Sequence, residues 1–205
     1  MNRKRENLVA CGAGFLVAVV QLAGAAQVAT GGVGKDVALN GGFEQMDTES
    51  AKPVGWTPYM AEEKLVSVTP GVARSGRMSA MLTAQGAPNS NLGLFQEQDV
   101  KPGDTYAFSA FVIENKDNEL DGVATGVLTI EWKDDAGNEV SRDASDTWSK
   151  LLLSKSQWRR VEVTGTAPAG AAKARFVVTL FEGDQPGKGS FCVDDVQITA
   201  KVAAP

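Results

Sequence analysis

The sequence predicts an all-β protein built as a single antiparallel β-sandwich. First, short apolar or alternating segments recur along the chain, and clusters of Gly, Pro, Asn and Asp separate them. Second, 22 Gly and 8 Pro among 205 residues fit a turn-rich globular domain better than a helical or disordered chain. Third, no helical periodicity is sustained beyond about two turns. The chain is therefore expected to form one domain with a sizeable core.

Nine segments have the pattern of strands, and turn residues lie between them. They are residues 37–39, 64–69, 79–83, 92–100, 105–114, 126–133, 159–164, 174–181 and 190–199. In the strand at 105–114 both faces are mostly apolar, which predicts a strand covered on both sides. The strand at 92–100 has one face that begins and ends apolar and carries Gln96 and Gln98 in its middle. This face is the one that we expect to meet a ligand.

Several motifs occur in an order that resembles the CenC-type carbohydrate-binding modules of families 4, 9 and 22. Gln96 on a strand, the Pro102-Gly103 turn and Tyr106 at the start of the next strand match that signature. The other motifs are LNGGFEQ (39–45), KPVGWTPY (52–59), VARSGRMSAML (72–82), QWRRVEVTGTAPAGAAKARF (157–176) and FCVDDVQI (191–198). The resemblance implies a galactose-binding-domain-like jelly roll that binds polysaccharide or oligosaccharide without catalysis.

The N-terminus has the features of an export signal. A basic stretch at 2–5 precedes a mostly apolar run at 8–22 and a small-residue site at 23–25. We therefore expect a signal peptide at 1–25, a flexible linker at 26–36, the sandwich at 37–200 and a tail at 201–205, in a protein that is secreted to the periplasm or beyond. A retained helix and lipidation at Cys11 remain alternatives. Without residues 1–25 the chain keeps only Cys192, which we expect to be a buried apolar side chain rather than a reactive thiol.

Charge and composition exclude several classes of function. The formal net charge is −5 and the pI about 4.9, which disfavours nucleic acids and anionic membrane surfaces as partners. The chain has no His, so Ser-His-Asp, Cys-His and His-rich metal sites are excluded. A hydrolase could use two carboxylates, but the nearest candidates, Glu131 with Asp134 and Asp135, lie at a predicted solvated hairpin end. We expect no enzymatic activity.

A structural calcium ion is the cofactor that the resemblance implies. Its ligands would be Glu44 of the NGGFE motif, Asp194 near the last strand, and backbone carbonyls of the loop around Ser75. Strand parity places Asp194 on the same side as Cys192, Val196 and Ile198, so an inward carboxylate that needs a partner is expected. The alternative is that Asp194 pairs with an arginine of the loop or with a backbone amide.

Aromatic side chains and amides would bind the sugar by ring stacking and by hydrogen bonds to hydroxyls. Trp148 lies in a polar segment without apolar neighbours, and Tyr59 follows Pro58 on a predicted loop, so we expect both rings to be exposed. Gln96 and Gln98 would lie beside them, although the resemblance also implies a role in folding for a Gln at this place. Trp132 alternates with apolar residues and is a core residue or a third stacking platform. A domain for adhesion or assembly in the cell envelope, with a protein partner, is the alternative function, since the same fold can serve both.

Overall fold

The computed structural model describes residues 34–59 and 65–201, and these form an antiparallel β-sandwich. The predicted signal peptide, residues 26–33 of the predicted linker and most of the predicted tail lie outside the described residues. Within the described ranges, no helix has the length and hydropathy of a membrane span. The fold class that the sequence predicts is confirmed.

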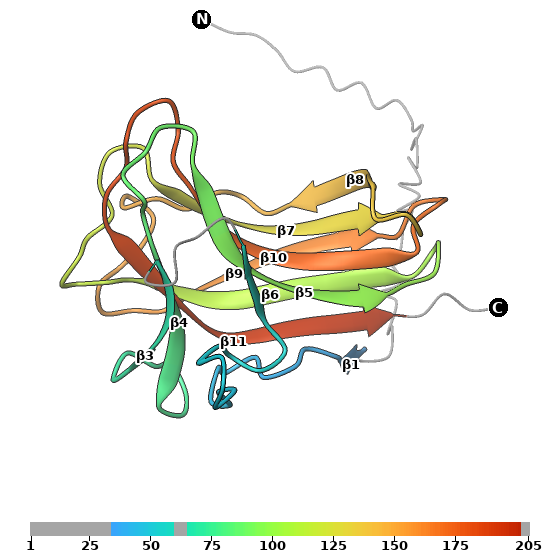
Figure 1. Cartoon of the computed structure of the whole chain (residues 1–205), viewed down its shortest axis with the longest axis horizontal. Helices are drawn as coiled ribbons and strands as arrows, with labels where there is room; N and C mark the ends of the chain where they lie inside the picture. Colours follow the sequence, from blue (N-terminus) through green and yellow to red (C-terminus); the bar gives the residue numbers. More distant parts are fainter. Residues whose placement is uncertain (1–33, 60–64, 202–205) are drawn as a thin grey trace, which may run out of the picture. The chain divides into compact units, whose positions relative to one another are not determined.

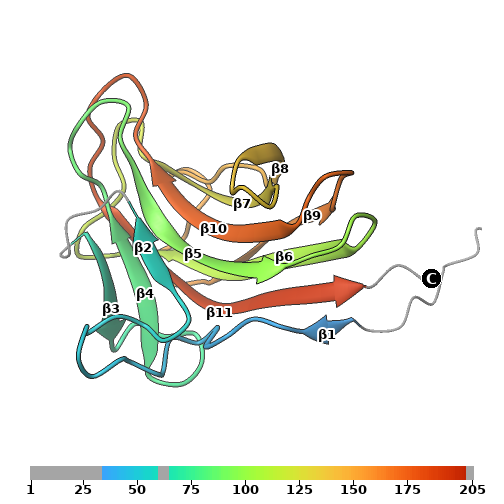
Figure 2. The same ribbon diagram turned by 45° about the vertical axis from the view of Figure 1, so that its right-hand side comes forward.

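Two sheets contain all the strands of the described residues (Figures 1 and 2). The six-stranded sheet has the order β3-β4-β11-β6-β9, with β1 also paired to β11, and the five-stranded sheet has the order β2-β5-β10-β7-β8. In Figure 2 the long strands β5 and β11 are visibly curved. The strands are β1 (Lys35–Asp36), β2 (Thr57–Tyr59), β3 (Val66–Pro70), β4 (Met78–Thr83), β5 (Asn91–Asp99), β6 (Thr105–Glu114), β7 (Thr125–Lys133), β8 (Glu139–Ala144), β9 (Arg159–Thr166), β10 (Lys173–Phe181) and β11 (Ser190–Lys201).

The core lies between the two sheets and is closed by aromatic contacts across them. The Phe108 ring of β6 meets the edge of Phe176 on β10, with ring centroids 5.6 Å apart. Tyr106 packs on Phe176 and on Trp132 of β7, at 5.5 and 6.1 Å. Tilted and edge-to-face pairs of this kind are the favoured aromatic geometry. They fix the sheets against each other in the first half of β6 and β10 and near the end of β7.

Three strands were not expected, and one expected strand is absent. Residues 37–39 form no strand; they run along the edge of the sandwich, where the Val37 N–H donates to the Ile198 carbonyl at 2.8 Å. β1 begins at Lys35, inside the segment predicted to be a linker. β8 is exposed along most of its length, so it lacks the apolar alternation by which a strand is recognised. β2 has only three residues and contains Pro58.

A bulge in β11 changes which residues face the core. The register between β11 and β6 shifts between Asp194 and Gln197, and Asp195 has a φ of 48°. Val193 belongs to the core, and beyond the bulge Val196 and Ile198 belong to it as well. Asp194 pairs with Phe111, which lies outside the core cluster. The predicted common face for Asp194 and the two later apolar residues is therefore wrong, because simple alternation cannot continue through a bulge.

Candidate functional site

The outer face of the five-stranded sheet carries aromatic and hydroxyl side chains at one side and charged side chains at the other. In one row across the strands, Tyr59 lies opposite Gly93, and Gly93 lies opposite Thr179. In the next row Phe95 lies opposite Val177, which lies opposite Thr129. We call the side chains of these rows the platform: Tyr59, Phe95, Thr129, Val177 and Thr179. The neighbouring leucines of β5 belong to the core, so alternation along the strand places the platform on the side away from it.

Tyr59 is held flat across the sheet. Its hydroxyl bonds the Thr179 hydroxyl at 2.6 Å, and its ring crosses Gly93, where a Cβ atom would lie 2.8 Å from Cε1 of the ring. Burial raises the pKa of Tyr59 to about 12. The tyrosine was expected on a loop, but it lies on β2, half-buried. Gly93 is thus the residue that allows the ring to lie against the backbone.

Phe95 lies beside Tyr59 and is covered by an arginine. The two ring centroids are 6.2 Å apart at an interplanar angle of 54°. The guanidinium of Arg175 stands 4.1 Å above the Phe95 ring, a cation–π contact. Nε and Nη2 of Arg175 also donate to Glu97 Oε2 at 3.3 and 3.1 Å. A planar, hydrogen-bonding group is therefore fixed over an aromatic ring at the centre of the face.

A row of ion pairs borders the platform. Lys173 donates to Glu97 Oε1 at 3.2 Å, and Arg142 of β8 lies 3.8 Å from Glu131. Desolvation of Glu97 raises its pKa, but the hydrogen bonds from Lys173 and Arg175 outweigh this, and the net shift is downward. The face therefore changes from aromatic and hydroxyl groups at one side to paired charges at the other. Glu97, Arg175 and Arg142 were not predicted from the sequence; for Glu97 the two-residue spacing from Phe95 on one strand was the available signal.

Gln96 and Gln98 face the opposite way from the prediction. Gln96 is only 3% exposed. The Leu39 N–H donates to Gln96 Oε1 at 3.0 Å, and Gln96 Nε2 donates to the Leu39 carbonyl at 2.5 Å. Gln98 Nε2 donates to the Val37 carbonyl at 3.1 Å. These amides hold the segment at 37–39 against β5, so the expectation that they meet a ligand is wrong.

Two predicted stacking platforms are buried. Trp148 was expected to be exposed, but it is 1% exposed and packs edge-on against Phe191 of β11, with centroids 5.4 Å apart. Its apolar neighbours come from distant parts of the sequence, so the polar segment around it gave a wrong prediction. Trp132 is also 1% exposed, and its Nε1 donates to Asp143 Oδ2 at 2.8 Å. Trp132 is therefore a core residue and not a stacking platform, which were the two roles expected for it.

The residues expected to bind calcium meet at one loop. Asp194, fully buried, accepts from the Arg74 and Ser75 N–H groups through Oδ2 at 2.7 and 3.1 Å. Glu44 Oε1 accepts from the Arg77 and Met78 N–H groups at 2.7 and 2.8 Å, which lowers the Glu44 pKa. Backbone amides are thus direct partners of both carboxylates. Within the described ranges, no group of three or more Asp, Glu, Cys or His side chains could hold a metal.

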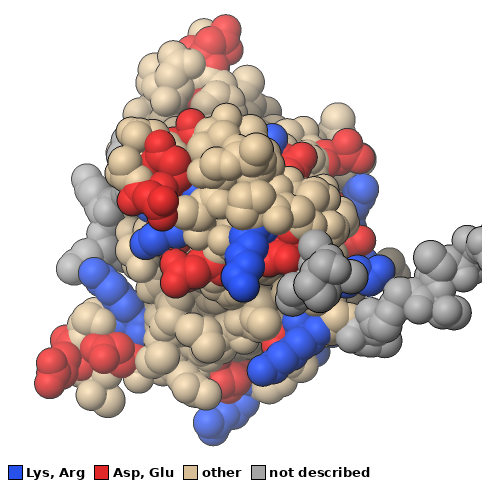
Figure 3. Space-filling view, turned by 90° about the vertical axis from the view of Figure 1, so that its right-hand side faces the viewer, with Lys and Arg blue, Asp and Glu red and all other residues tan. Residues whose placement is uncertain are grey.

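Charges of both signs are mixed on the surface. On the face in Figure 3, Lys and Arg alternate with Asp and Glu, and no large patch of one sign is visible.

Cys192 is buried, and burial raises the pKa of its thiol to about 11. This agrees with the prediction that it is a buried side chain rather than a reactive thiol.

Known proteins share both the sequence pattern and the fold. Endo-1,4-beta-xylanase A of Thermotoga neapolitana is 28% identical over 165 residues, which are 77% of this chain and 14% of that protein. The chain thus spans about a seventh of that relative. The CBM22-1 xylan-binding domain of Paenibacillus barcinonensis Xyn10C has a TM-score of 0.58 at 19% identity, with 84% of this chain and 98% of that one covered. TmCBM61, solved with beta-1,4-galactotriose, has a TM-score of 0.53 at 15% identity and coverages of 82% and 99%.

The family assignment rests on the sequence. A sequence model of the carbohydrate binding domain family matches residues 35–186, most of the chain. This range begins at β1 and continues beyond the end of β10, so it includes every strand of the platform. The two structural likenesses above show that the fold is that of such modules. The chain therefore belongs to the carbohydrate-binding domain family, and its sandwich is a carbohydrate-binding module.

Proposed function

We propose that the module binds a β-1,4-linked polysaccharide on the outer face of its five-stranded sheet, without catalysing a reaction. The observation that carries this proposal is the adjacent pair of Tyr59 and Phe95 rings, with their centroids 6.2 Å apart. The names of similar proteins support the ligand class, since they include a xylanase, a xylan-binding domain and a module bound to β-1,4-galactotriose.

Each part of the face has a role in this binding. The apolar C–H surfaces of the sugar rings pack against the Tyr59 ring and against the exposed part of Phe95, beside the Arg175 guanidinium that stands over its ring. Arg175, backed by Phe95 and held by Glu97, donates to hydroxyl groups from a fixed plane, so little side-chain entropy is lost on binding. The hydroxyl of Thr179, which already bonds Tyr59, offers a further polar contact. A long, flat ligand suits this arrangement because these groups lie across three neighbouring strands, β2, β5 and β10.

The charges on the face support a binding role without catalysis. A glycosidase of the usual kind needs one carboxyl group whose pKa is raised, so that it can donate a proton to the leaving oxygen. The pKa of Glu97 is lowered instead, by its bonds to Lys173 and Arg175. Glu131 lies against Arg142 at 3.8 Å. Both carboxylates are therefore suited to accept hydrogen bonds from sugar hydroxyls.

Depletion of the protein from solution by insoluble xylan, galactan and cellulose tests whether it binds them. Calorimetry with xylohexaose and galactotriose then measures the affinity. Phe95→Ala is expected to lower the affinity by about tenfold or more, because it removes the stacking surface and the support of Arg175. Leu151→Ala, at a 93% exposed position on a loop, is the control and should bind normally. Wild-type affinity in a folded Phe95→Ala variant would reject this face. Absence of binding to every glycan would favour the envelope-assembly alternative and a protein partner.

We also propose that a calcium ion strengthens the loop at 74–78. Glu44 and Asp194 supply hard carboxylate oxygens on the two sides of this loop, and Glu44 Oε2 has no hydrogen bond to the described residues. Carboxylates are among the ligands that Ca²⁺ takes, together with backbone carbonyls. When bound, the ion would neutralise two negative groups that now face only amides. From the predicted export signal we also propose that this module functions outside the cytoplasm.

A further inference from the structure

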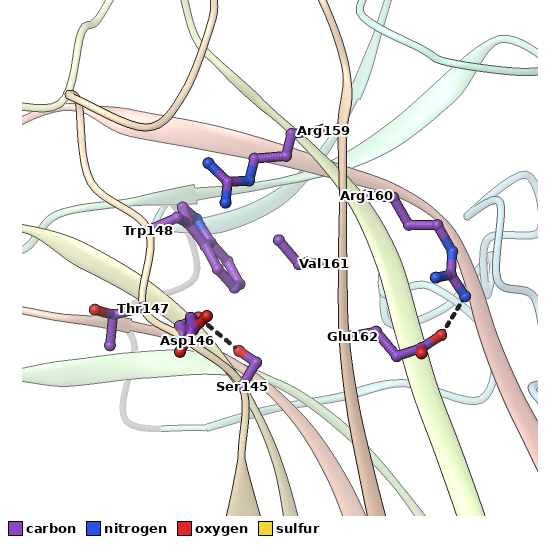
Figure 4. Close-up of a pocket in the computed structure, with 8 residues that line it drawn as sticks. All are labelled: Ser145, Asp146, Thr147, Trp148, Arg159, Arg160, Val161 and Glu162. Atoms are coloured by element: carbon purple, nitrogen blue, oxygen red, sulfur yellow. Dashed lines mark hydrogen bonds and ion pairs between the residues drawn. The ribbon is translucent and has the colours of Figure 1, made fainter. Parts of the chain in front are cut away.

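A small cavity lies beside the end strand of the six-stranded sheet. Its volume is about 140 Å³, and it lies between β9 and the segment that follows β8 (Figure 4). None of its lining residues belongs to the platform. The residues that line it are Ser145, Asp146, Thr147, Trp148, Arg159, Arg160, Val161 and Glu162.

Trp148 is fixed in the wall of this cavity by its backbone and its ring. It forms two backbone hydrogen bonds with Gly126, at 2.8 and 2.9 Å. The ring lies so close to Gly126 that a Cβ there would be 2.1 Å from Cε2. Phe191 packs against it from inside the sandwich. The indole is therefore held in one position.

The indole N–H of Trp148 lacks an acceptor. Within the described residues, Trp148 Nε1 is the one buried side-chain nitrogen or oxygen that has no hydrogen-bond partner. By contrast, Nε1 of Trp132 donates to Asp143 Oδ2 at 2.8 Å, and Nε1 of Trp56 donates to the Asn40 carbonyl at 3.2 Å. A buried donor without a partner is unfavourable, and a ligand oxygen in the cavity would remove the penalty.

The charges around the cavity indicate a neutral ligand that both donates and accepts hydrogen bonds. Arg160 is paired with Glu162. Arg159 donates to the Leu152 carbonyl at 3.2 Å through Nη1, which leaves its other N–H groups for a ligand. Asp146 adds an exposed carboxylate, so the two signs balance. In Figure 4 the Arg159 guanidinium lies beside the Trp148 ring. Hydroxyl groups match this mixture of donors and an acceptor.

We propose that this cavity is a second carbohydrate site that takes a single glycosyl unit, at a chain end or a side branch. One sugar hydroxyl accepts from Trp148 Nε1 and Arg159, and another donates to Asp146. The cavity is smaller than the roughly 300–1,000 Å³ of pockets that enclose drug-sized ligands, so it has no room for the interior of a glycan chain. The site extends the proposed function, but it can fail or succeed independently of the platform, because the two share no residue.

Nuclear magnetic resonance of the side-chain indole N–H groups tests this directly. The protein has four tryptophans, and Trp148→Phe identifies the Trp148 signal by its loss. The probes are methyl xyloside, methyl glucoside and methyl galactoside, titrated into the protein one at a time. We expect at least one of them to shift the Trp148 signal while the Trp132 and Trp56 signals stay in place, because those two N–H groups already have acceptors.

Variants separate the cavity from the platform. Trp148→Phe and Arg159→Gln should each weaken binding of the effective monosaccharide by about tenfold, since each removes a donor. Lys188→Gln, at an exposed position outside the cavity, should bind as wild type. Phe95→Ala should leave the Trp148 shift intact even when it abolishes binding of xylohexaose.

Two results would overturn the proposal. One is a Trp148 signal that none of the three monosaccharides moves at saturating concentration. The other is an unchanged affinity in both Trp148→Phe and Arg159→Gln, which would show that neither side chain donates a hydrogen bond to the sugar. If Trp148→Phe does not fold, Arg159→Gln decides alone, because its side chain is exposed and its loss leaves the core unchanged.

Discussion

Gln96 and Leu39 are joined by two hydrogen bonds, one in each direction between the side-chain amide and the backbone. This pairing attaches the segment before the first long strand to the five-stranded sheet. We predict that Gln96→Ala lowers the free energy of unfolding by about 2 kcal/mol, because two hydrogen bonds to Leu39, each worth about 1 kcal/mol, are lost. Its affinity for xylohexaose should equal that of the wild type. Urea denaturation and calorimetry measure the two quantities.

Gln98→Ala is the matched control for Gln96, because its side chain makes one bond to the same segment, at 3.1 Å from the Val37 carbonyl. It should destabilise the protein by about 1 kcal/mol. A loss of sugar affinity in folded Gln96→Ala would contradict the assignment of this residue to the inner face.

Gly126→Ala should be strongly destabilising. A Cβ at this position would lie between 2.1 and 2.4 Å from three atoms of the Trp148 ring, so the ring must move away from Phe191. We expect a loss of about 3 kcal/mol in unfolding free energy, at the upper end of the range for overpacked cores. Gly183→Ala is the comparison, since its nearest contact would be 3.4 Å from Val123. A change below about 0.5 kcal/mol is expected there, and equal effects of the two variants would show that Trp148 is not held against Gly126.

Alkaline titration should reveal Tyr59 as a late-ionising phenol. Burial raises its pKa from 10.0 to about 12, so folding favours the protonated form. Its contribution to stability is therefore complete below pH 10.0 and is lost as the pH rises from there to about 12. The chain has two tyrosines, and the pKa of Tyr106 is raised as well. Ultraviolet absorbance of the phenolate should show the component near pH 12 in the wild type and lose it in Tyr59→Phe.

Calcium should raise the melting temperature if the loop at 74–78 binds it. At a free calcium concentration about a hundredfold above the dissociation constant, the stabilisation is about 2.7 kcal/mol, or about 5–10 °C for a domain of this size. Glu44→Gln keeps an oxygen for the Arg77 and Met78 amides but loses the charge. The wild type and this variant should melt close together in chelator, and only the wild type should gain from calcium. If the wild type melts at the same temperature with and without chelator, the proposal that this loop binds calcium is wrong.

The long strands of the fold could be predicted from the sequence because their apolar residues are local and regular. The strand expected at 105–114 coincides with β6, and the one expected at 92–100 differs from β5 by one residue at each end. β8 could not be found in this way, since its side chains are exposed almost throughout. A two-residue strand such as β1 has no periodicity at all and exists through its pairing with β11.

The candidate site was harder to predict than the fold, for physical reasons that differ between residues. Alternation showed which residues of β5 share a face, but polar amides at Gln96 and Gln98 made the inner face look like the ligand-binding one. The burial of Trp148 depends on Phe191 and Gly126, which come from other strands. Asp194 was placed by alternation, which the bulge in β11 interrupts. Such long-range contacts leave no local pattern in the sequence.

The pairing of β1 with β11 places the two ends of the described sandwich side by side, with Lys35 opposite Ala200. A polypeptide that enters and leaves the module there does so at one corner, so the sandwich projects from the chain as a side branch. Tension between the flanking segments would act first on this short ladder and on the bond from Val37 to Ile198. Val37 and Leu39 are also bonded to Gln98 and Gln96, so a load that opened the ladder would next reach β5, the strand that carries Phe95 of the platform.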